Sequence, residues 1–422
     1  MKFEKIIIKG IEISLMIFAI GSPFSISLAQ IGFVSALVFW ILRLIFIRDV
    51  KLKGTFIDIF LLIYIFGLFL SSIFSIKPIE SLKANKNIWL FSMIYLIVNN
   101  VDLNFSKKLL KIILISATLS GVYGIFQSLT GIDIVRGRLN PYGRYFYGAW
   151  GGFGLHLTYG GYQMMIAIIF LAIMIYSLSS FNDIKIRVLI IFASIVNILS
   201  VLASFSRAAW AGFLAGILAL IGISLFTRKR IGFIVIGVFI VLILLFLIIP
   251  DIKNRFFLTL NPLKDLPRKE IWSGSLEMIK DHPVFGVGSG MFARHFENYK
   301  PDFKNLYGKV YGHPHNDFLA AYLRAGIIGF IGFIMIFVMF IIKMFKFYNK
   351  LLKEGFKLYS SLILGFVSSV IGFLVAGLGQ NYFTDSENAM LLFFVFGISF
   401  VIYNKFIIIM NLKEEIKKNN TC

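Results

Sequence analysis

The chain has 422 residues, of which 58% are hydrophobic and only 15% are charged, and its mean hydropathy is +0.86. A soluble globular domain is far less apolar, so the composition excludes that class. The formal net charge is +21, but the basic residues fall in short loops between apolar runs, which favours membrane orientation over nucleic-acid binding.

Apolar runs recur along the whole chain. Runs of about 18 or more residues predict transmembrane helices, because about 20 residues at a rise of 1.5 Å span the hydrocarbon core. We therefore predict an all-α polytopic membrane protein, a single domain over residues 1–422 with about twelve transmembrane helices. The predicted spans lie near 6–22, 28–47, 56–75, 87–99, 107–129, 159–180, 186–204, 208–227, 231–249, 315–346, 357–379 and 388–410.

Basic loops orient these spans. Short loops rich in Lys and Arg, such as 228–230 and 343–357, fall on the same side as both termini, so we expect the termini to be cytoplasmic. The long segment 251–314, between the ninth and tenth spans, is then an extracytoplasmic loop. Apolar residues repeat at helical spacing over 271–279, and Lys280-Asp281-His282-Pro283 is a plausible stop, so we expect amphipathic helices in this loop.

The first 29 residues also resemble a secretory signal, with Lys2, Lys5 and Lys9 before an apolar stretch and Ser27-Leu28-Ala29 as a small-residue cleavage site. Cleavage there would remove one span without changing the orientation of the others.

Two of the five histidines, His313 and His315, flank a proline at the entrance to a predicted span. Imidazole titrates near neutral pH, so it can take a proton from a hydroxyl at a membrane surface. The alternative is that the histidines cap or orient the next helix, with Asn316 or Asp317 as the actual N-cap. No His, Cys or Asp cluster at ligand spacing accompanies them, and the single cysteine is Cys422, so the sequence predicts neither a metal site nor another cofactor.

Arginines mark the other candidate positions. Arg207 lies between two apolar spans with almost no loop, where a guanidinium is costly unless it faces a cavity or a partner; the alternative is that it snorkels to the interface beside Trp210. Arg268 suits the oxygens of a phosphate, or is an ordinary charge on a solvated loop helix. A glycine-rich and aromatic segment, 131–158, carries Arg136, Arg138 and Arg144.

Two glycine patterns have structural interpretations. Gly286-Val-Gly288-Ser-Gly290 has no βαβ setting and no Gly-Lys-Ser/Thr continuation, so it predicts a turn after a loop helix rather than a phosphate loop. The spacing of Gly326, Gly329 and Gly332 predicts close helix packing.

Together these residues resemble the O-antigen ligase and O-antigen polymerase superfamily of bacterial membrane glycosyltransferases. The specific motifs lie within about 204–329. In chain order, the matching pieces are Ser206-Arg207-Ala-Ala-Trp210, Arg268-x3-Trp272 followed by Asp281-His-Pro-Val-Phe-Gly286-Val-Gly288, and His313-x-His315-Asn316-x2-Leu319 leading to Gly326-Ile-Ile-Gly329.

The resemblance implies transfer of a glycan from undecaprenyl diphosphate to an acceptor hydroxyl at the periplasmic face of the bacterial inner membrane, without a divalent metal. The expected partners are the undecaprenyl-diphosphate-linked glycan, membrane lipids and, in the ligase branch, lipid A–core oligosaccharide. In the polymerase branch the acceptor is another undecaprenyl-linked repeat, and a third branch transfers glycan to protein. We expect no nucleic-acid partner.

The resemblance also implies roles for the candidate residues. Arg207 and Arg268 would bind the donor diphosphate and stabilise the charge that develops on it. His315 would accept the proton of the acceptor hydroxyl as the sugar is displaced, giving inversion at the anomeric carbon. His313 would orient His315 or act as the base instead. The candidates for binding an anionic acceptor or a lipid phosphate are Arg136, Arg138, Arg144 and Arg324.

Two further functions stay open. The basic segment 131–158 favours a ligase over a polymerase, because its arginines suit a phosphorylated acceptor. A polytopic transporter or flippase is the alternative from another class; it would show inverted repeats and discontinuous helices in matching halves, which the sequence does not reveal.

Overall fold

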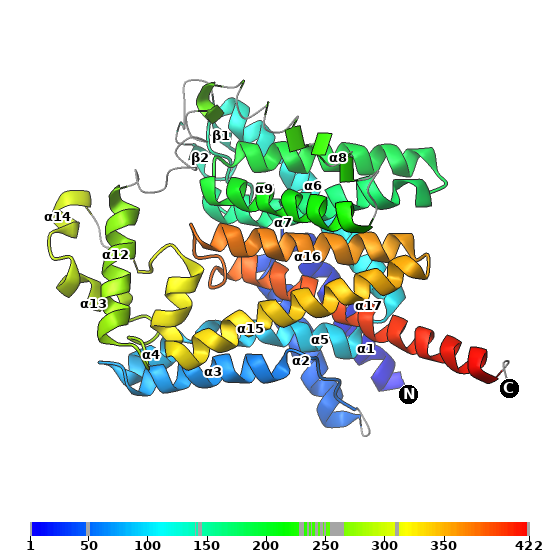
Figure 1. The fold of residues 1–422 in the computed structure, drawn as a ribbon, viewed down its shortest axis with the longest axis horizontal. Coiled ribbons are helices and arrows are strands. Elements are labelled where there is room, and N and C mark those ends of the chain that lie inside the picture. Colours follow the sequence, from blue (N-terminus) through cyan, green and yellow to red (C-terminus); the bar gives the residue numbers. More distant parts are fainter. Residues whose placement is uncertain are drawn as a thin grey trace.

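A computed structural model describes residues 2–47, 51–139, 141, 146–227, parts of 232–253, 266–308 and 312–419. Long helices form a bundle, and short helices gather at one end of it (Figure 1). The helices and strands are α1 (Lys2–Gly21), α2 (Ile26–Phe46), α3 (Asp58–Ile73), α4 (Pro78–Ala84), the 3-10 helix η1 (Lys86–Phe91), α5 (Ser92–Asn100), α6 (Leu103–Thr130), β1 (Ile132–Asp133), β2 (Gly137–Arg138), α7 (His156–Ser177), the 3-10 helix η2 (Leu178–Ser180), α8 (Ile184–Ala203), α9 (Arg207–Thr227), α12 (Leu266–Asp281), α13 (Phe292–Tyr299), α14 (Phe303–Tyr307), α15 (Asp317–Lys353), α16 (Lys357–Gly377) and α17 (Ser386–Asn419).

Eight helices in the described part of the chain are long and apolar enough to cross a membrane, namely α2, α6, α7, α8, α9, α15, α16 and α17. The prediction of an all-α polytopic membrane protein is confirmed at this level. The predicted spans at 6–22 and 56–75 coincide with α1 and with the 16-residue α3. Most of the predicted span at 231–249 lies outside the described residues, so the count of twelve stays a prediction.

The predicted span at 87–99 is not one continuous helix. Its place is taken by η1 and by α5, which has nine residues and is therefore only about 14 Å long, less than half the thickness of the hydrocarbon core. At the break before η1, the side-chain amide of Asn85 donates to Ser72 of α3 at 2.9 Å. The hydropathy pattern misses this interruption because it measures apolarity and not the type of helix.

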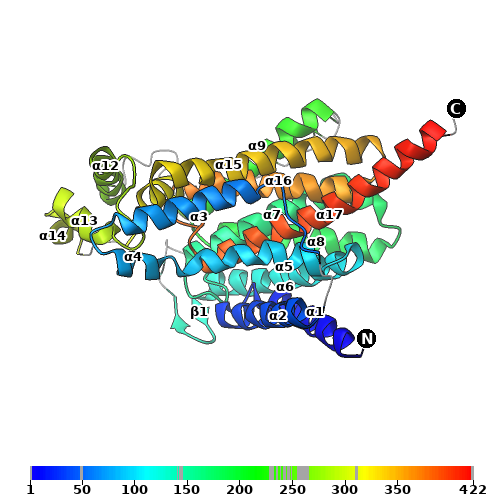
Figure 2. The ribbon, with the colours of Figure 1, turned by 90° about the horizontal axis from the view of Figure 1, so that it is seen from below.

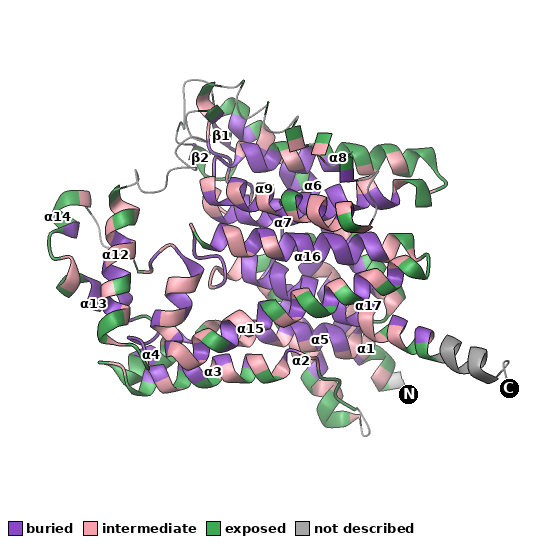
Figure 3. Cartoon of the chain, viewed as in Figure 1, coloured by how far each residue is buried: buried purple, intermediate pink, exposed green. Residues whose placement is uncertain are grey.

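Burial separates an inner set of helices from an outer set. The most buried spans are α7 and α16, whereas α2 and α8 expose apolar side chains on their outer faces (Figure 3). On α2 these exposed side chains include Ile31, Val38 and Ile45. An apolar surface of this size is expected of helices that contact lipid.

Glycines allow α15 to approach α3 closely. A Cβ added to Gly67 would lie 2.4 Å from the backbone of Gly329, and one added to Gly332 would lie 2.6 Å from the backbone nitrogen of Tyr64. The predicted close packing is therefore confirmed for Gly329 and Gly332.

Gly326 has a different role from the one predicted. Its φ of 64° and ψ of −173° interrupt α15, so the N–H of Ile327 cannot bond to the carbonyl of Leu323. The glycine turn after α12 satisfies both groups: Ile327 donates to Val284 at 3.0 Å, and the N–H groups of Val287 and Gly288 donate to Leu323 at 2.8 and 3.1 Å. The predicted turn at 286–290 is confirmed, and it supports the break in α15.

The two ends of the bundle differ. Figures 1 and 2 both place α4, the β1–β2 hairpin and α12–α14 at one end, and both chain termini at the opposite end. The candidate residues at the start of α15 lie at the first of these ends.

Candidate functional site

The histidine segment is attached to the helix that follows it by a well-formed cap. The side-chain oxygen of Asn316 accepts hydrogen bonds from the N–H groups of Phe318 and Leu319 at 2.9 and 3.1 Å, so Asn316 is the N-cap of α15. One of the two predicted caps is thereby confirmed. His313 and His315 precede the cap and do not take its place.

The loop between α16 and α17 holds the start of α15 in position. Asp317, which is 3% exposed, accepts hydrogen bonds from the backbone N–H groups of Tyr382 and Phe383 at 3.2 and 2.9 Å. Asn316 donates to the carbonyl of Leu378 at 3.0 Å. Two segments more than sixty residues apart therefore form one rigid unit.

The same loop orients His315. Nδ1 of His315 lies 2.9 Å from the amide oxygen of Gln380, which can only accept, so Nδ1 carries the proton. In the neutral ring the lone pair then lies on Nε2.

His313 takes the opposite tautomer. Its Nδ1 accepts the backbone N–H of His315 at 3.3 Å, so in the neutral ring Nε2 carries the proton. Burial, together with the nearby His315 and Arg324, lowers the pKa of His313 to about 4, so the ring is neutral at neutral pH. The two ring centroids lie 4.3 Å apart. The structure thus offers one proton acceptor, His315, beside one proton donor, His313.

Backbone strain marks the same region. Within the described ranges, Phe205 and His315 are the two residues other than glycine with positive φ, each at 50°. Such a conformation costs on the order of 1 kcal/mol and persists where the surrounding structure enforces it, which is common at functional sites. Phe205 precedes the Ser206-Arg207 motif, so the strained positions coincide with two of the three candidate motifs.

The start of α9, with Arg207, and the side chain of Arg268 both contact the loop between α16 and α17, which also contacts His315. Arg207 begins α9, and both arginines are half-buried. A Cβ added to Gly379 would lie 3.5 Å from Cβ of Ala208 and 3.6 Å from Nη1 of Arg268, so the start of α9 and the Arg268 guanidinium meet at this glycine. Gly379 precedes Gln380, the partner of His315.

Tryptophans fix both arginine segments. Trp210 is fully buried and donates from its indole N–H to the carbonyl of Val201 at 2.9 Å, so it is no interfacial anchor beside a snorkelling Arg207. Trp272 donates to the carbonyl of Pro314, between the two histidines, at 3.1 Å. Because Trp272 and Arg268 belong to the same helix, α12, this hydrogen bond joins the Arg268 helix to the histidine segment. The helix ends at Asp281, as the sequence predicts.

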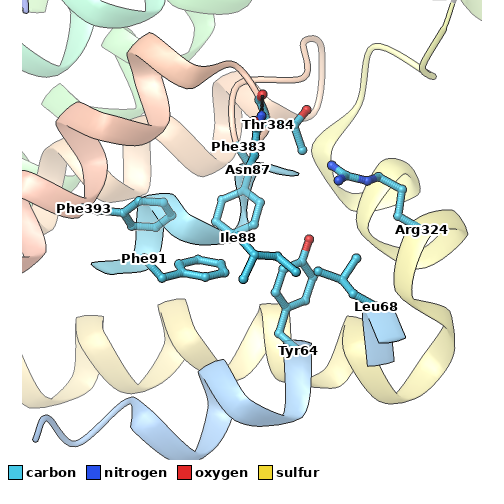
Figure 4. A pocket seen from close by; sticks show the side chains of 9 residues that line it. All are labelled: Tyr64, Leu68, Asn87, Ile88, Phe91, Arg324, Phe383, Thr384 and Phe393. Carbon is cyan, nitrogen blue, oxygen red and sulfur yellow. Dashed lines mark hydrogen bonds between the residues drawn. The ribbon is translucent and has the colours of Figure 1, made fainter. Parts of the chain in front are cut away.

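A cavity of about 220 Å³ opens beside the histidines on the side of His313. Its lining includes Asn87, Gly288, His313, Arg324, Asn381 and Thr384. A cleft continues from it into the aromatic core between Tyr64, Phe91, Phe383 and Phe393, and Arg324 points into this cleft from α15 (Figure 4).

The arginines of segment 131–158 are placed differently. Arg136, on the exposed turn between β1 and β2, lies 3.6 Å from the buried carboxylate of Asp133 and donates to the carbonyl of Gly152 at 3.0 Å. Arg138 is exposed on β2. Arg144 lies outside the described residues.

Residues 190–334 match the family model described as O-antigen ligase. The resemblance to the O-antigen ligase superfamily is confirmed. The matched range runs from α8 into α15 and contains Arg207, Arg268, His313, His315 and Arg324. The family comprises membrane glycosyltransferase-like enzymes, and no curated protein matches the chain.

Several residues of the site lie outside the O-antigen ligase match and were missed in the sequence. These are Asn87 on η1 and, between α16 and α17, Gln380, Asn381 and Thr384. A polar run between two apolar spans is the signal in the sequence that could have located them. Among the residues that the structure describes, no group of three or more His, Cys, Asp or Glu side chains is placed to hold a metal ion.

Proposed function

We propose that the protein is an O-antigen ligase that transfers a glycan from undecaprenyl diphosphate to a hydroxyl of lipid A–core oligosaccharide. The observation that carries the proposal is the hydrogen bond between His315 Nδ1 and Gln380, inside a site to which the family motifs contribute two arginines. This bond places the lone pair of the neutral ring on Nε2, which is the nitrogen that would act as the general base.

The base acts on the acceptor. As the acceptor oxygen attacks the anomeric carbon, its proton passes to Nε2 of His315 and the bond from that carbon to the diphosphate oxygen breaks. Attack from the side opposite the leaving group inverts the anomeric centre. Gln380 is the positioning residue, since it selects the tautomer and also stabilises the imidazolium that forms.

The arginines act on the donor. Breaking the bond from sugar to diphosphate leaves negative charge on the leaving phosphate. Arg268, at Gly379, and Arg207, at the start of α9, bind this group and stabilise it most strongly in the transition state, where its charge is largest. The diphosphate would lie on the Gln380 side of the histidine pair.

The arrangement of the ends supports a location in the bacterial inner membrane with both termini cytoplasmic and the site periplasmic. The termini and the site lie at opposite ends of the bundle (Figure 2), and the basic segment 343–357, where α15 ends and α16 begins, lies at the terminal end. The β1–β2 hairpin lies at the site end (Figure 1), so Arg136 and Arg138 would attract an anionic acceptor before it binds. We propose the same role for Arg144, which lies outside the described residues.

Reconstitution with undecaprenyl-linked glycan tests the proposal. Purified protein in vesicles is offered either lipid A–core or a second lipid-linked repeat as the acceptor, and the products are separated by size and by lipid. Glycan on lipid A–core, with the anomeric configuration inverted, is the expected result. Growth of the glycan on the lipid carrier, with none on lipid A–core, would show a polymerase instead.

A further inference from the structure

The cavity on the His313 side is positively charged. None of the lining residues that the structure describes is Asp or Glu, and Arg324 supplies a full positive charge. Within the described part of the chain its hydrogen-bond partner is neutral: Nε donates to the hydroxyl of Ser289 at 3.3 Å. The nearby Asp317 uses its two oxygens to accept backbone N–H groups of Tyr382 and Phe383.

Arg324 is held in place by the break in α15. It lies between Leu323, whose carbonyl accepts from the glycine turn, and the non-helical Gly326. Ser289 of the same turn bonds in addition to Asn85, before η1. The guanidinium is therefore anchored through Nε while Nη1 and Nη2 extend toward Asn87 and Thr384 (Figure 4). These two nitrogens form the fork that binds two oxygens of a phosphate.

The surroundings strengthen this charge. On one side of Arg324 lie the aromatic walls of the cleft, Tyr64, Phe91 and Phe383, which keep the local dielectric constant low. The other side opens into the cavity, which is smaller than the roughly 300 Å³ of the smallest pockets for drug-sized ligands. It accommodates one charged group of a larger substrate and not the whole substrate.

Two positively charged regions lie beside the histidine pair. Gln380 binds His315, and Arg268 lies at the adjacent Gly379, so the first region is on the His315 side. Arg324 and His313 line the cavity, so the second region is on the His313 side. A reaction that joins two substrates at one base needs them on both sides of that base.

The geometry points to Arg324, with Asn87 and Thr384, as a subsite for a phosphate group of the acceptor, separate from the site that binds the donor diphosphate. This inference rests on the proposed transferase function and adds a substrate requirement to it: the protein prefers a phosphorylated acceptor. The hydroxyl that reacts would lie between this phosphate and the donor, at His315.

The test uses matched acceptors. Initial rates are measured with lipid A–core that carries phosphate on its core sugars and with the same glycolipid after removal of those phosphates. R324Q should raise KM for the phosphorylated acceptor about tenfold, because it removes a charge-assisted hydrogen bond. KM for the dephosphorylated acceptor and for the donor should change less than about twofold, and R324K should fall between R324Q and the wild type.

The matched control is R294Q. Arg294 lies on α13, is exposed and pairs with Glu80 at 2.7 Å, so its loss should leave both acceptors unaffected. Should R324Q fail to fold, the wild-type protein gives the same information. Inorganic phosphate should then inhibit it competitively against the phosphorylated acceptor, whether or not phosphate also competes with the donor diphosphate.

Three outcomes overturn the subsite: an equal rise in KM for both acceptors, a rise in donor KM, or phosphate inhibition that does not compete with the phosphorylated acceptor. Binding of the two acceptors to the protein in nanodiscs separates this inference from the proposed function. If no glycan reaches lipid A–core, yet binding depends on phosphate and on Arg324, the ligase proposal fails and the subsite stands. If glycan is transferred to both acceptors equally well, the ligase proposal stands and the phosphate subsite fails.

Discussion

Two regions at the same end of the molecule carry arginines that the sequence marks equally as anion-binding candidates. On the β1–β2 hairpin, Arg136 lies beside the carboxylate of Asp133, and a carbonyl takes a further N–H. At the break in α15, Arg324 bonds to a neutral hydroxyl and lines a cavity whose described lining has no carboxylate. A basic residue therefore indicates an anion site only where no carboxylate pairs with it directly and the surrounding structure partly encloses it.

The largest expected loss of activity comes from the histidine segment, and it should far exceed any loss from the hairpin. H315N removes the base but keeps a residue that tolerates a φ of 50°, so the backbone is preserved. Turnover should fall by about 10²- to 10⁴-fold, as for loss of a general base. The check is kcat of the reconstituted protein beside its unfolding midpoint; a folded H315N with more than a tenth of wild-type kcat would contradict the assignment.

The donor arginines should give the next largest effect. R268Q and R207Q should each lower kcat/KM by about 10- to 100-fold, because each removes a charged hydrogen bond to the leaving diphosphate. The rate is measured at varied donor concentration, with R294Q as the surface control. Full activity in both variants would remove the donor clamp.

The loop between α16 and α17 can be loosened through Asp317. D317A leaves two buried N–H groups, of Tyr382 and Phe383, without an acceptor and should destabilise the fold by about 1–3 kcal/mol. D317N keeps an oxygen for one of them and should lose less. Thermal unfolding in detergent measures both variants, and equal midpoints for D317A and the wild type would show that this contact does not hold the loop.

His313 should affect the rate modestly and leave the pH profile unchanged near neutrality. Since its pKa is lowered to about 4, the ring gains a proton only as the pH falls through that value and is neutral above about pH 5. H313Q keeps a side chain that can both donate and accept. It should lower kcat by about tenfold or less, and log kcat against pH between 5 and 8 should keep its wild-type shape. A limb in that range that disappears in H313Q would identify His313 as the base.

The smallest effect is expected on the hairpin. R138Q removes an exposed charge that attracts the acceptor only at long range, so KM for the phosphorylated acceptor should rise less than about threefold. Salt should abolish even this change, because exposed charges are screened beyond about 10 Å at 0.1 M ionic strength. Acceptor titrations at low and high salt measure it. An effect larger than that of R324Q would reverse the comparison between the two regions.

Much of the fold followed from local patterns. Apolar runs located the helices, and the turn signals of 280–290 located the end of α12 and the glycine turn. The pattern failed at 87–99 and at Gly326, where an interrupted helix and a continuous one have the same apolarity. The interruption at Gly326 depends on a partner distant in sequence, the turn at 284–288, whose backbone groups bond to Leu323 and Ile327.

By itself, the sequence determined that this is a helical membrane protein with the motifs of a glycosyltransferase family, and that His313, His315, Arg207 and Arg268 are candidates. Hydropathy, spacing and residue type are properties of short segments, so they can be read along the chain. Only the tertiary structure decided which histidine has a nitrogen ready to accept a proton, because Gln380 lies 65 residues from His315. It also decided which arginine is neutralised, since the groups around a charge come from helices that meet only in the folded protein.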